Sequence, residues 1–360
     1  MRIVQIIDSL EIGGAEKMAV NYANSLATRI DFSGLVTTRA EGNLKKQVDN
    51  SVSYLFLKKN ATFDFGAVNR LRKYCIENKV EYVHAHSSSY FISILLKLIY
   101  PKIKIIWHDH NGLGELISFK ETLALQVSSF LFENVIVVNN NLKLWAEKKL
   151  NCAKVIYLPN FTTIANSSLK KKTILFGIEG KRILCLANLR LQKNHFLLLQ
   201  VAEKLKITNP DWTFHLVGKD FKDDYSSRIK NEIIAKKLEK SVFVYGSKND
   251  IGAILNQSDI AILTSLSEGL PVSLLEYGLL KKPVVLTDVG EIPSIVKDEV
   301  SGFIVGVKQI DLFYEKVLKL IEDESLRSSL GNSLHKTIIE NHSQDRVIKD
   351  YLAWIKSHII

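Results

Sequence analysis

Short runs of β-branched and aliphatic residues alternate along this chain with longer amphipathic segments. That alternation is typical of parallel α/β sheets, in which helices connect successive strands. In the first half, the pattern predicts strands at 3–8, 33–37, 52–57, 82–84, 103–107, 135–138 and 155–158. The first predicted helix has a regular apolar stripe at three- and four-residue spacing, formed by Ala15, Met18, Ala19, Tyr22, Ala23 and Leu26.

The pattern breaks after Pro159, where residues 160–181 are polar and basic, and then it restarts. Strands are predicted at 183–187, 213–217, 242–244, 260–264, 284–287 and 303–305, followed by amphipathic helices at the C-terminal end. A chain of 360 residues fits two domains of ordinary size. We therefore expect a Rossmann-like domain over 1–165, a linker over 166–180, a second Rossmann-like domain over 181–343 and a last helix over 344–360.

The amino-acid composition indicates the class of protein and its compartment. The apolar share of 46% and the charged share of 24% are those of a globular protein. Three cysteines, odd in number and far apart, fit no disulfide framework and no CxxC metal pattern, which favours a reducing cytoplasm. The apolar run at the start and the run at 90–100, which includes Lys97, are too short to cross a bilayer.

The formal charge of +10 raises the question of an anionic partner. Nucleic acid is not expected, because no basic stripe interleaved with aromatic residues and no RNP, KH or zinc-finger pattern is present. Two interpretations remain open. The lysines bind an anionic membrane surface or a phosphate-linked acceptor, which would make the protein peripheral on the inner face of the cell membrane, or they form a well-solvated surface.

The first predicted strand is followed by Gly13-Gly14 and then Glu16, at the start of a helix. Paired glycines let backbone amides at a helix N-terminus approach a phosphate, although a tight turn alone also explains them. A nicotinamide dehydrogenase is not expected, since GxGxxG and an acidic residue after the second strand are both missing.

Two His-x-His pairs end successive strands, His84 with His86 and His108 with His110. Strand alternation puts both members of a pair on one side, and the ends of parallel strands are where α/β proteins keep their sites. We expect these histidines to face the crevice and to hydrogen-bond a sugar hydroxyl or the acceptor. Structural polarity and a zinc cluster are the alternatives; a zinc cluster is disfavoured, because no further ligand stands at motif spacing beyond Asp109.

The strongest signal is the run from Ser267 to Glu276, which lies between two apolar strands. Pro271 suits the first position of a helix, and the amides of Gly269 and Leu270 then lie at its positive end, ready for a diphosphate. Glu276 falls roughly 7.5 Å along that helix, and Glu268 precedes it. Both carboxylates can accept hydrogen bonds from vicinal hydroxyls of a sugar and a ribose.

Cations that offset these carboxylates and a diphosphate follow the first strand of the second domain. Arg190 can bind a phosphate through two hydrogen bonds, and Lys193 supplies a compact charge. Without these basic residues and the flanking strands, Glu268 and Glu276 would be interpreted as solvated acids on the protein surface.

These features together resemble the GT4-like family of GT-B glycosyltransferases, and the resemblance covers nearly the whole chain. Its motifs here are Gly-Gly-Ala-Glu at 13–16, Val-His-Ala-His at 83–86, Leu-Pro-Asn at 158–160, Gln-Lys-Asn-His at 192–195, His-Leu-Val-Gly at 215–218, Val-Tyr-Gly at 244–246, Glu-x7-Glu at 268–276, the segments 287–292 and 300–305. One departure is Asn188, where many relatives carry arginine; Arg190 is displaced by two positions.

The resemblance implies two Rossmann-like domains facing each other across a cleft, retention of anomeric configuration and no metal requirement. It implies that Glu268 contacts the donor sugar and that Glu276 contacts the ribose. Lys193 and Arg190 would bind the diphosphate, which Gly14 would approach from the first domain. His110 or His108 would lie beside the reacting sugar, and the catalytic residues would be Glu268, His110 and Lys193. Possible acceptor-side residues are Glu16, His84, His86 and His108.

The expected activity is therefore transfer of a sugar from a UDP- or GDP-sugar to a glycan or lipid-linked acceptor in bacterial cell-surface polysaccharide synthesis. No cofactor and no metal ion is expected. Two alternatives stay open: a nucleotide-sugar 2-epimerase of the same fold, and a non-catalytic nucleotide-sugar-binding subunit.

Overall fold

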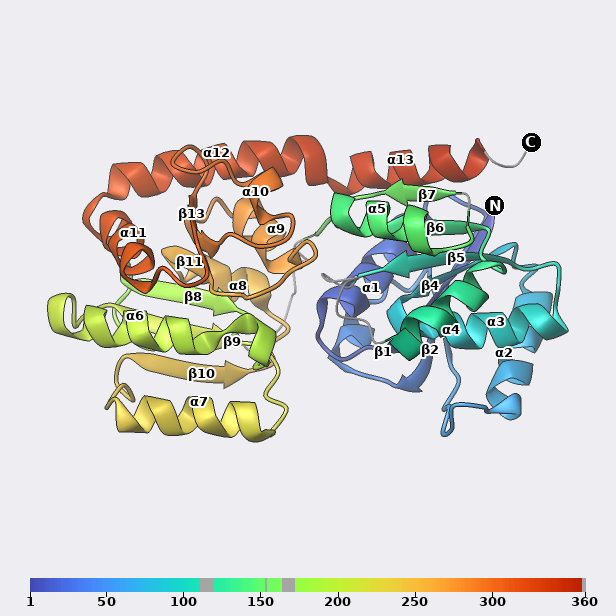
Figure 1. The fold of residues 1–360 in the computed structure, drawn as a ribbon, viewed down its shortest axis with the longest axis horizontal. Coiled ribbons are helices and arrows are strands. Elements are labelled where there is room, and N and C mark those ends of the chain that lie inside the picture. The colour runs from blue at the N-terminus through green and yellow to red at the C-terminus, as the bar shows by residue number, and fades with distance from the viewer. Residues whose placement is uncertain (111–118, 153, 164–171, 358–360) are drawn as a thin grey trace. The chain divides into compact units, whose positions relative to one another are not determined.

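The computed structural model describes residues 1–110, 119–152, 154–163 and 172–357. The chain divides into two compact units (Figure 1). Unit 1 comprises Met1–Thr162 and Gln344–Ile360, and unit 2 comprises Thr163–Ser343. Each unit is built around one wholly parallel sheet, as the alternating pattern predicts.

Unit 1 has a seven-stranded sheet in the order β3-β2-β1-β4-β5-β6-β7. Its strands are β1 (Arg2–Ser9), β2 (Phe32–Ala40), β3 (Ser53–Phe56), β4 (Tyr82–His86), β5 (Lys104–Asp109), β6 (Asn134–Val137) and β7 (Val155–Tyr157). Its helices are α1 (Gly14–Ala27), α2 (Phe65–Glu77), α3 (Tyr90–Ile99), α4 (Phe119–Ser129), α5 (Asn140–Lys149) and α13 (Gln344–Lys356).

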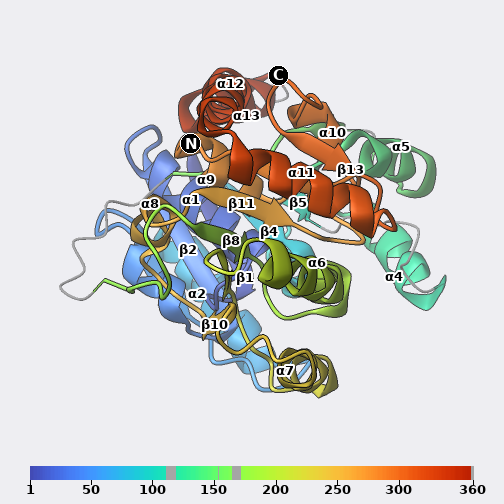
Figure 2. The same ribbon diagram turned by 90° about the vertical axis from the view of Figure 1, so that its left-hand side faces the viewer.

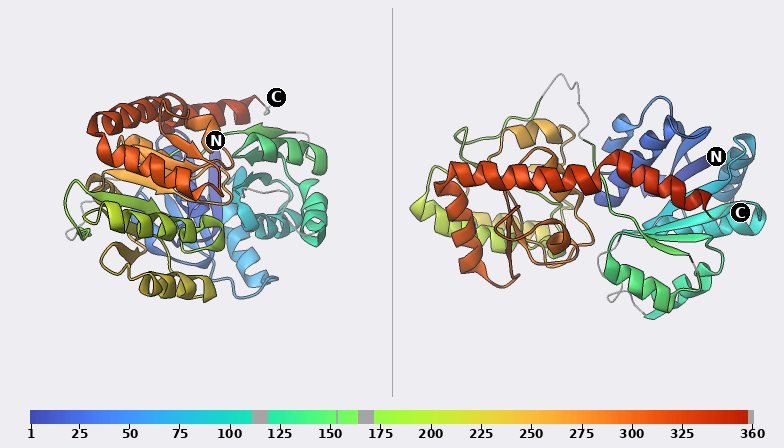
Figure 3. Two further views of the ribbon diagram at one scale, coloured as in Figure 1. Left: turned by 60° about the vertical axis from the view of Figure 1, so that its left-hand side comes forward. Right: turned by 90° about the horizontal axis from the view of Figure 1, so that it is seen from above.

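The strand order places the helices of unit 1 on two faces. The chain runs from β1 outward to β3, then returns to β4 and continues outward to β7 on the other side. Because parallel crossovers are right-handed, these opposite directions put α1 on one face and α2 to α5 on the other. Helix α13 joins α1 on its face and lies across unit 1 in the view from above (Figure 3).

Unit 2 has a six-stranded sheet in the order β10-β9-β8-β11-β12-β13. Its strands are β8 (Arg182–Leu186), β9 (Thr213–Val217), β10 (Val242–Gly246), β11 (Ile260–Leu263), β12 (Val284–Thr287) and β13 (Phe303–Val305). Its helices are α6 (His195–Thr208), α7 (Asp224–Ala235), α8 (Ile251–Asn256), α9 (Val272–Leu279), α10 (Ile292–Ile295), α11 (Ile310–Glu322) and α12 (Glu324–His342).

The same handedness rule divides these helices. Helices α6 and α7 cover one face together with α11, which packs beside α6 (Figure 2), and α8 to α10 cover the other face, where α12 packs on α9. The central strands of the two sheets, β4 and β8, are buried along their whole lengths. Parallel strands that are buried along their whole lengths need helices on both faces.

Polar residues fix where several helices begin. The side chains of Asp64, Asn139, Asp223 and Asp323 each accept a hydrogen bond from a backbone N–H in the first turn of α2, α5, α7 and α12. Each cap satisfies one of the otherwise unpaired amides at a helix start.

The polar segment expected to be a linker is partly held to unit 2. Residues 164–171 lie outside the described part, but Thr173 donates from its backbone and its hydroxyl to the carboxylate of Asp250, at 2.5 and 2.9 Å. The backbone N–H of Phe176 donates to the Tyr245 hydroxyl at 2.9 Å. These hydrogen bonds hold residues 173 and 176 of the expected linker to unit 2.

No helix within the described residues combines the length and the apolar character that crossing a bilayer requires.

Candidate active site

Three residues of unit 2 meet around one carboxylate. Glu268 lies in the loop between β11 and α9, and its Oε1 atom is 2.5 Å from Nζ of Lys193. The Ser265 hydroxyl donates to the same oxygen at 2.6 Å. The Glu268 side chain is only 8% exposed. A charged donor and a hydroxyl therefore fix this carboxylate in one orientation.

The loop that carries Glu268 is supported by the segment after β12. The Thr287 hydroxyl donates to the backbone oxygen of Ser265 at 2.6 Å, and the Glu291 N–H donates to that of Gly269 at 3.0 Å. Gly290 has φ +57°, and a Cβ there would lie 2.0 Å from the Glu268 carbonyl oxygen. Only glycine fits so close to another backbone in this conformation.

Lys193 is positioned from the other side by a short 3-10 helix, Leu191–Lys193. The Thr264 hydroxyl donates to the Lys193 carbonyl at 3.0 Å, and the Leu266 N–H donates to that of Gln192 at 2.8 Å. Both donors belong to the segment after β11 that leads to Glu268. The pairing of lysine and glutamate is thus built into the contact between two loops at the carboxyl ends of β8 and β11.

Helix α9 begins next to this pair. Pro271 is its N-cap residue, with φ −68° and ψ 120°, and the first helical residue is Val272. The expectation that Pro271 takes the first helical position is wrong by one residue, because its ψ is extended rather than helical. Glu276 is the fifth residue of α9 and is 7% exposed, while Leu270 before the helix is 4% exposed. A buried acid on this otherwise apolar helix lies one turn from its positive end.

Arg190 does not join the Lys193–Glu268 pair. Its side chain is exposed, and its guanidinium lies 4.4 Å from the ring centre of Phe221, which Lys219 also approaches at 5.2 Å. Asn188 accepts a hydrogen bond from the Lys219 N–H at 2.7 Å. Arg190 and Lys219 therefore contact the same aromatic ring, whereas Lys193 is paired with Glu268.

In unit 1, the glycine pair forms the start of α1. Gly13 is its N-cap residue in an extended conformation, and Gly14 is the first helical residue and is exposed. The Glu16 carboxylate folds back over Gly13, since a Cβ on Gly13 would lie 2.2 Å from its Oε2. An acid in the first turn suits the positive helix end.

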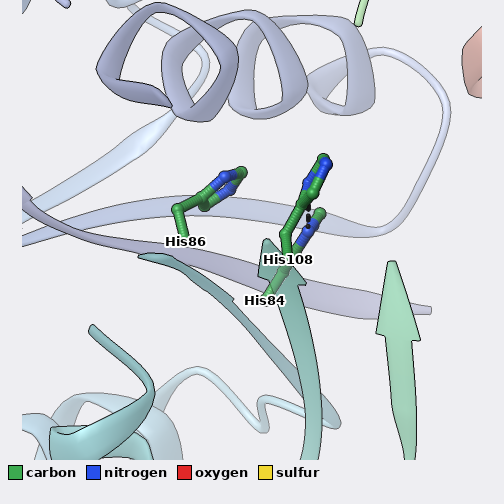
Figure 4. A group of neighbouring side chains, drawn as sticks. All are labelled: His84, His86 and His108. Atoms are coloured by element: carbon green, nitrogen blue, oxygen red, sulfur yellow. Dashed lines mark hydrogen bonds between the residues drawn. The ribbon is translucent and has the colours of Figure 1, made fainter. Parts of the chain in front are cut away.

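The histidines of β4 and β5 project to the same side of the sheet, where they form a stack (Figure 4). The rings of His84 and His86 are 4.4 Å apart, those of His84 and His108 5.2 Å, and those of His108 and His110 3.9 Å. Tyr22 of α1 packs edge-on against two of these rings. The stack thus lies beneath α1 and α13.

Hydrogen bonds join these rings into two short chains. In the first, the Tyr351 hydroxyl is 3.2 Å from Nδ1 of His84, whose Nε2 is 3.1 Å from Nδ1 of His108. In the second, Oε1 of Gln5 is 2.9 Å from Nε2 of His86, whose Nδ1 is 2.8 Å from Nε2 of His110. Each chain begins in the interior of unit 1 and ends at the histidine nearer the carboxyl end of β5.

Burial keeps the stack uncharged. It lowers the pKa of His110 to about 3 and lowers the pKa values of His84, His86 and His108 well below the usual range, and the neighbouring imidazoles add to the effect for these three. Neutral imidazoles act as hydrogen-bond donors and acceptors rather than as cations.

Ligand atoms of His84, His86 and His108 lie within 4.8 Å of one another, and this is the one such group of potential metal ligands among the described residues. Their arrangement suits stacking better than ligation. The rings of His84 and His108 are nearly parallel, with 12° between their planes, and His84 and His86 use both nitrogens in hydrogen bonds. The only nearby carboxylate in sequence, Asp109, points to the other face of the sheet, as alternation requires.

The histidines differ from the expectation that they face a crevice. His84, His86 and His108 are fully buried, and the partners found for His84 and His86 all belong to unit 1. Only His110 keeps partial exposure. The expectation is wrong for His84, His86 and His108, because α1 and α13 cover this face of the sheet. Tyr22 of α1 packs on the rings, Tyr351 of α13 is hydrogen-bonded to His84, and Gln5 of β1 is hydrogen-bonded to His86.

The residues that orient these groups are not among the predicted site residues. Ser265 stands three positions before Glu268, so its spacing is a usable signal. Gln5 and Tyr351 hold the histidines from β1 and from the last helix. Contacts between residues so far apart in sequence depend on the tertiary fold.

Two family models together match nearly the whole chain. The model described as Glycosyltransferase Family 4 matches residues 12–165, and the model described as Glycosyl transferases group 1 matches residues 166–337. The chain belongs to the GT4-like, group 1 glycosyltransferases. The resemblance inferred from the motifs is confirmed.

Among curated relatives, this glycosyltransferase is similar to the poly(ribitol-phosphate) alpha-N-acetylglucosaminyltransferase of Staphylococcus aureus (strain COL), with 26% identity over 69% of this chain and 49% of that enzyme. The chain therefore spans about half the length of that relative. It is also similar to the UDP-Gal:alpha-D-GlcNAc-diphosphoundecaprenol alpha-1,3-galactosyltransferase of Escherichia coli, with 25% identity over 83% of each chain.

Solved structures agree on the fold. The Anabaena protein Alr3699/HepE, crystallised with UDP and glucose, superposes with a TM-score of 0.83 at 16% identity, covering 99% of this chain and 100% of that one. A point mutant of the S. aureus protein TarM, in complex with fondaparinux, alpha-GlcNAc-glycerol and UDP, gives a TM-score of 0.79 at 16% identity, over 98% and 99%. The expected GT-B fold is thereby confirmed.

Proposed function

We propose that this glycosyltransferase moves a sugar, with retention of anomeric configuration and without a metal ion, from a nucleoside-diphosphate donor to a lipid-linked glycan. The observation that carries the proposal is the Lys193–Glu268–Ser265 cluster beside the start of α9. It combines a cation for a diphosphate with a fixed acceptor of sugar hydroxyl hydrogen bonds.

Departure of a nucleoside diphosphate builds negative charge on the leaving phosphate. Lys193 and the amides at the start of α9 would stabilise that charge, and because they are already in place little reorganisation is needed. Glu268 would accept hydrogen bonds from the transferring sugar, and Glu276 from the ribose. Arg190 would assist only after leaving its position over Phe221.

In this transfer the bond between the anomeric carbon and the phosphate oxygen breaks, while a bond to the acceptor oxygen forms on the same face. The acceptor hydroxyl loses its proton to the leaving phosphate oxygen. His110, which keeps partial exposure and is neutral at physiological pH, would donate or accept a hydrogen bond beside the reacting sugar, with the His108 ring stacked against it. Gly14, exposed at the start of α1, would approach the diphosphate through its backbone.

The lipid-linked acceptor is proposed from the relatives. The E. coli enzyme is named for a diphosphoundecaprenol-linked substrate, and another relative is the amylovoran biosynthesis glycosyltransferase AmsD of Erwinia amylovora. An acceptor of that kind would keep this protein at the cytoplasmic face of a membrane.

A thermal-shift panel of nucleoside diphosphates and nucleotide sugars tests the donor site, because a ligand of the folded state raises the melting temperature by mass action. We expect UDP or GDP and their sugars to raise it in the wild type, and Lys193→Gln to lose most of that shift. Lys236→Gln is the matched control, since Lys236 also forms a 2.5 Å ion pair, with Glu203, outside this cluster.

No shift with any nucleotide would refute the donor assignment. A donor sugar that is isomerised in the absence of acceptor would favour a 2-epimerase instead. Product with an inverted anomeric centre, determined by NMR, would refute retention.

A further inference from the structure

The exposed apolar side chains of unit 1 gather on one of its two faces. Among its described residues, every strongly exposed large apolar side chain lies on or next to helices α2 to α5, and none lies on α1 or α13. These residues, which define the α2–α5 face, are Phe63, Phe65, Ile76, Leu98, Ile99, Leu123, Val127, Phe130 and Leu144. Scattered exposed apolar residues are ordinary, but a gathering on one face marks an interaction surface.

Helix α4 shows the feature most clearly. Leu123, Val127 and Phe130 follow one another at four- and three-residue spacing and are 52%, 63% and 71% exposed. They therefore form one apolar stripe along the outer side of the helix and its end. A helix of a soluble domain normally turns such a stripe toward the core.

The same part of the chain concentrates positive charge. Residues 58–154 contain 14 lysines and arginines against eight aspartates and glutamates, which gives +6 of the chain's +10 in about a quarter of its length. One acid of this segment, Asp109, and one lysine, Lys59, are buried, so the excess of +6 is carried by the other charged residues. Exposed apolar side chains in so basic a segment match the chemistry of an anionic lipid bilayer, where apolar groups enter the acyl boundary and cations meet the headgroups.

A basic pocket of about 470 Å³ opens at the amino-terminal edge of the same sheet. Lys79, Lys102 and Lys104 line it together with Tyr82, Tyr100 and one acid, Glu81, and the exposed Ile76 also contributes to its wall. Lys79 and Lys102 closely follow the ends of α2 and α3, where cations are favourable. This edge is opposite to the one where His108 and His110 end their strand.

We propose that the α2–α5 face docks on an anionic lipid bilayer, and that the pocket of Lys79, Lys102 and Lys104 takes a lipid phosphate. The histidine face and the carboxyl end of the sheet then stay clear of the bilayer. The inference concerns a binding surface and does not depend on the transfer chemistry, because it can be measured without any donor.

Sedimentation of the full chain with vesicles tests the proposal, using phosphatidylcholine alone and phosphatidylcholine mixed with phosphatidylglycerol. The wild type should bind the anionic vesicles and not the neutral ones. The double substitution Leu123→Asp/Val127→Asp should lower the partition coefficient tenfold or more. The control is Ile207→Asp/Ile234→Asp on unit 2, where the two side chains are 82% and 61% exposed. This control variant should bind vesicles like the wild type.

Lys79→Gln/Lys102→Gln/Lys104→Gln tests the pocket and should weaken binding on the order of a hundredfold, at about fivefold for each lysine. Lys222→Gln/Lys240→Gln/Lys308→Gln removes the same charge from unit 2, and Lys222 shares the left-handed backbone of Lys79. It should have little effect. Melting curves with and without UDP in each variant separate loss of folding or of donor binding from loss of the membrane surface.

Equal sedimentation with neutral and anionic vesicles, or equal losses in the test and control variants, would overturn the proposal. The proposal would also be overturned if the wild type dimerised with rising concentration but did not bind lipid, and if Leu123→Asp/Val127→Asp abolished that dimerisation. If added inorganic phosphate competed but vesicles did not bind, the pocket would be a site for free phosphate and the docking proposal would be wrong.

Discussion

The ammonium group of Lys193 lies 2.5 Å from the carboxylate of Glu268, and the two side chains are only 19% and 8% exposed. A second lysine–glutamate pair, Lys236 with Glu203, has the same separation but is 22% and 46% exposed. The first pair is also bound by Ser265 and held by two interlocked loops. Exposed ion pairs contribute little to stability, whereas removal of one partner from a buried ion pair strongly lowers the free energy of unfolding.

Glu268→Gln should reduce turnover roughly 10²-fold, by comparison with removal of a preorganised group from an active site. Binding of the free nucleoside diphosphate should persist, since Lys193 keeps its charge and loses a competing anion. Calorimetry with the diphosphate and initial rates measure the two effects. Glu203→Gln is the control and should change neither; full turnover in Glu268→Gln would contradict the assignment.

Glu276→Gln should act mainly on affinity. If this buried carboxylate on α9 accepts hydrogen bonds from the ribose, its loss should weaken nucleotide and donor binding by about 1–3 kcal/mol, the range for hydrogen bonds to charged groups. Interactions that are equal in the ground and transition states change KM rather than kcat. A variant with normal nucleotide affinity and reduced kcat would show that Glu276 contacts the reacting sugar instead.

The sequence predicts the strands of both sheets well, because parallel strands buried on two faces are short apolar runs between amphipathic helices. Strands β9, β12 and β13 have the predicted limits. Others differ at their ends: β2 continues to Ala40 and β4 to His86, since pairing with a neighbouring strand extends them beyond the apolar run.

The site is less predictable than the fold. The closeness of Glu268 to the cations follows from strand order, since β8 and β11 are neighbours in the sheet. The position of Arg190 does not: a single aromatic ring, Phe221, holds it elsewhere. The histidines look like site residues in sequence, but α13, encoded more than 230 residues later, covers His84. Such contacts are set by tertiary packing and leave no local pattern.

Transferase activity should survive EDTA. The proposed donor site offers Lys193 and helix amides to the diphosphate, and the histidine stack is arranged by mutual hydrogen bonds. Rates are measured after dialysis against chelator and again after addition of Mn²⁺ or Zn²⁺. Loss of activity that a metal restores would refute metal independence. In that case, if metal failed to restore activity to His86→Gln but restored it to Glu203→Gln, the ion would be located at the histidines.

Tyr351→Phe should weaken unit 1 and slow turnover together. It removes the hydroxyl beside Nδ1 of His84 and leaves a buried nitrogen unsatisfied, at a cost of about 1–3 kcal/mol in the free energy of unfolding. Through the hydrogen bond from His84 to His108 it would also free the His108 ring. We therefore expect a lower kcat with an unchanged KM for the donor.

Tyr74→Phe is the matched control for this experiment. The Tyr74 hydroxyl donates to the Ser53 carbonyl at 3.1 Å in unit 1, away from the histidine stack. Its loss should lower stability without changing kcat. If both variants slow turnover equally, the Tyr351 hydroxyl acts through general stability and does not position His108.

The histidine stack should make unit 1 sensitive to mild acid. In the folded protein burial lowers the pKa of His110 to about 3 and keeps those of its three neighbours well below the usual range, while an unfolded histidine has a pKa of about 6.5. Below about pH 6.5 the unfolded state therefore binds more protons than the folded state. The free energy of unfolding should fall by about 1.4 kcal/mol per pH unit for each such histidine.

Urea denaturation followed by tryptophan fluorescence between about pH 7.5 and pH 5 measures this slope. His110→Gln provides the sharp comparison, because a glutamine amide still donates to Nδ1 of His86 but cannot titrate. Its slope should be smaller than that of the wild type by about 1.4 kcal/mol per pH unit. His195, whose pKa is lowered to about 4 by burial, adds its own share in unit 2 and is unaffected by the change. Equal slopes in the two proteins would mean that His110 becomes protonated without unfolding, and that the stack is open to solvent.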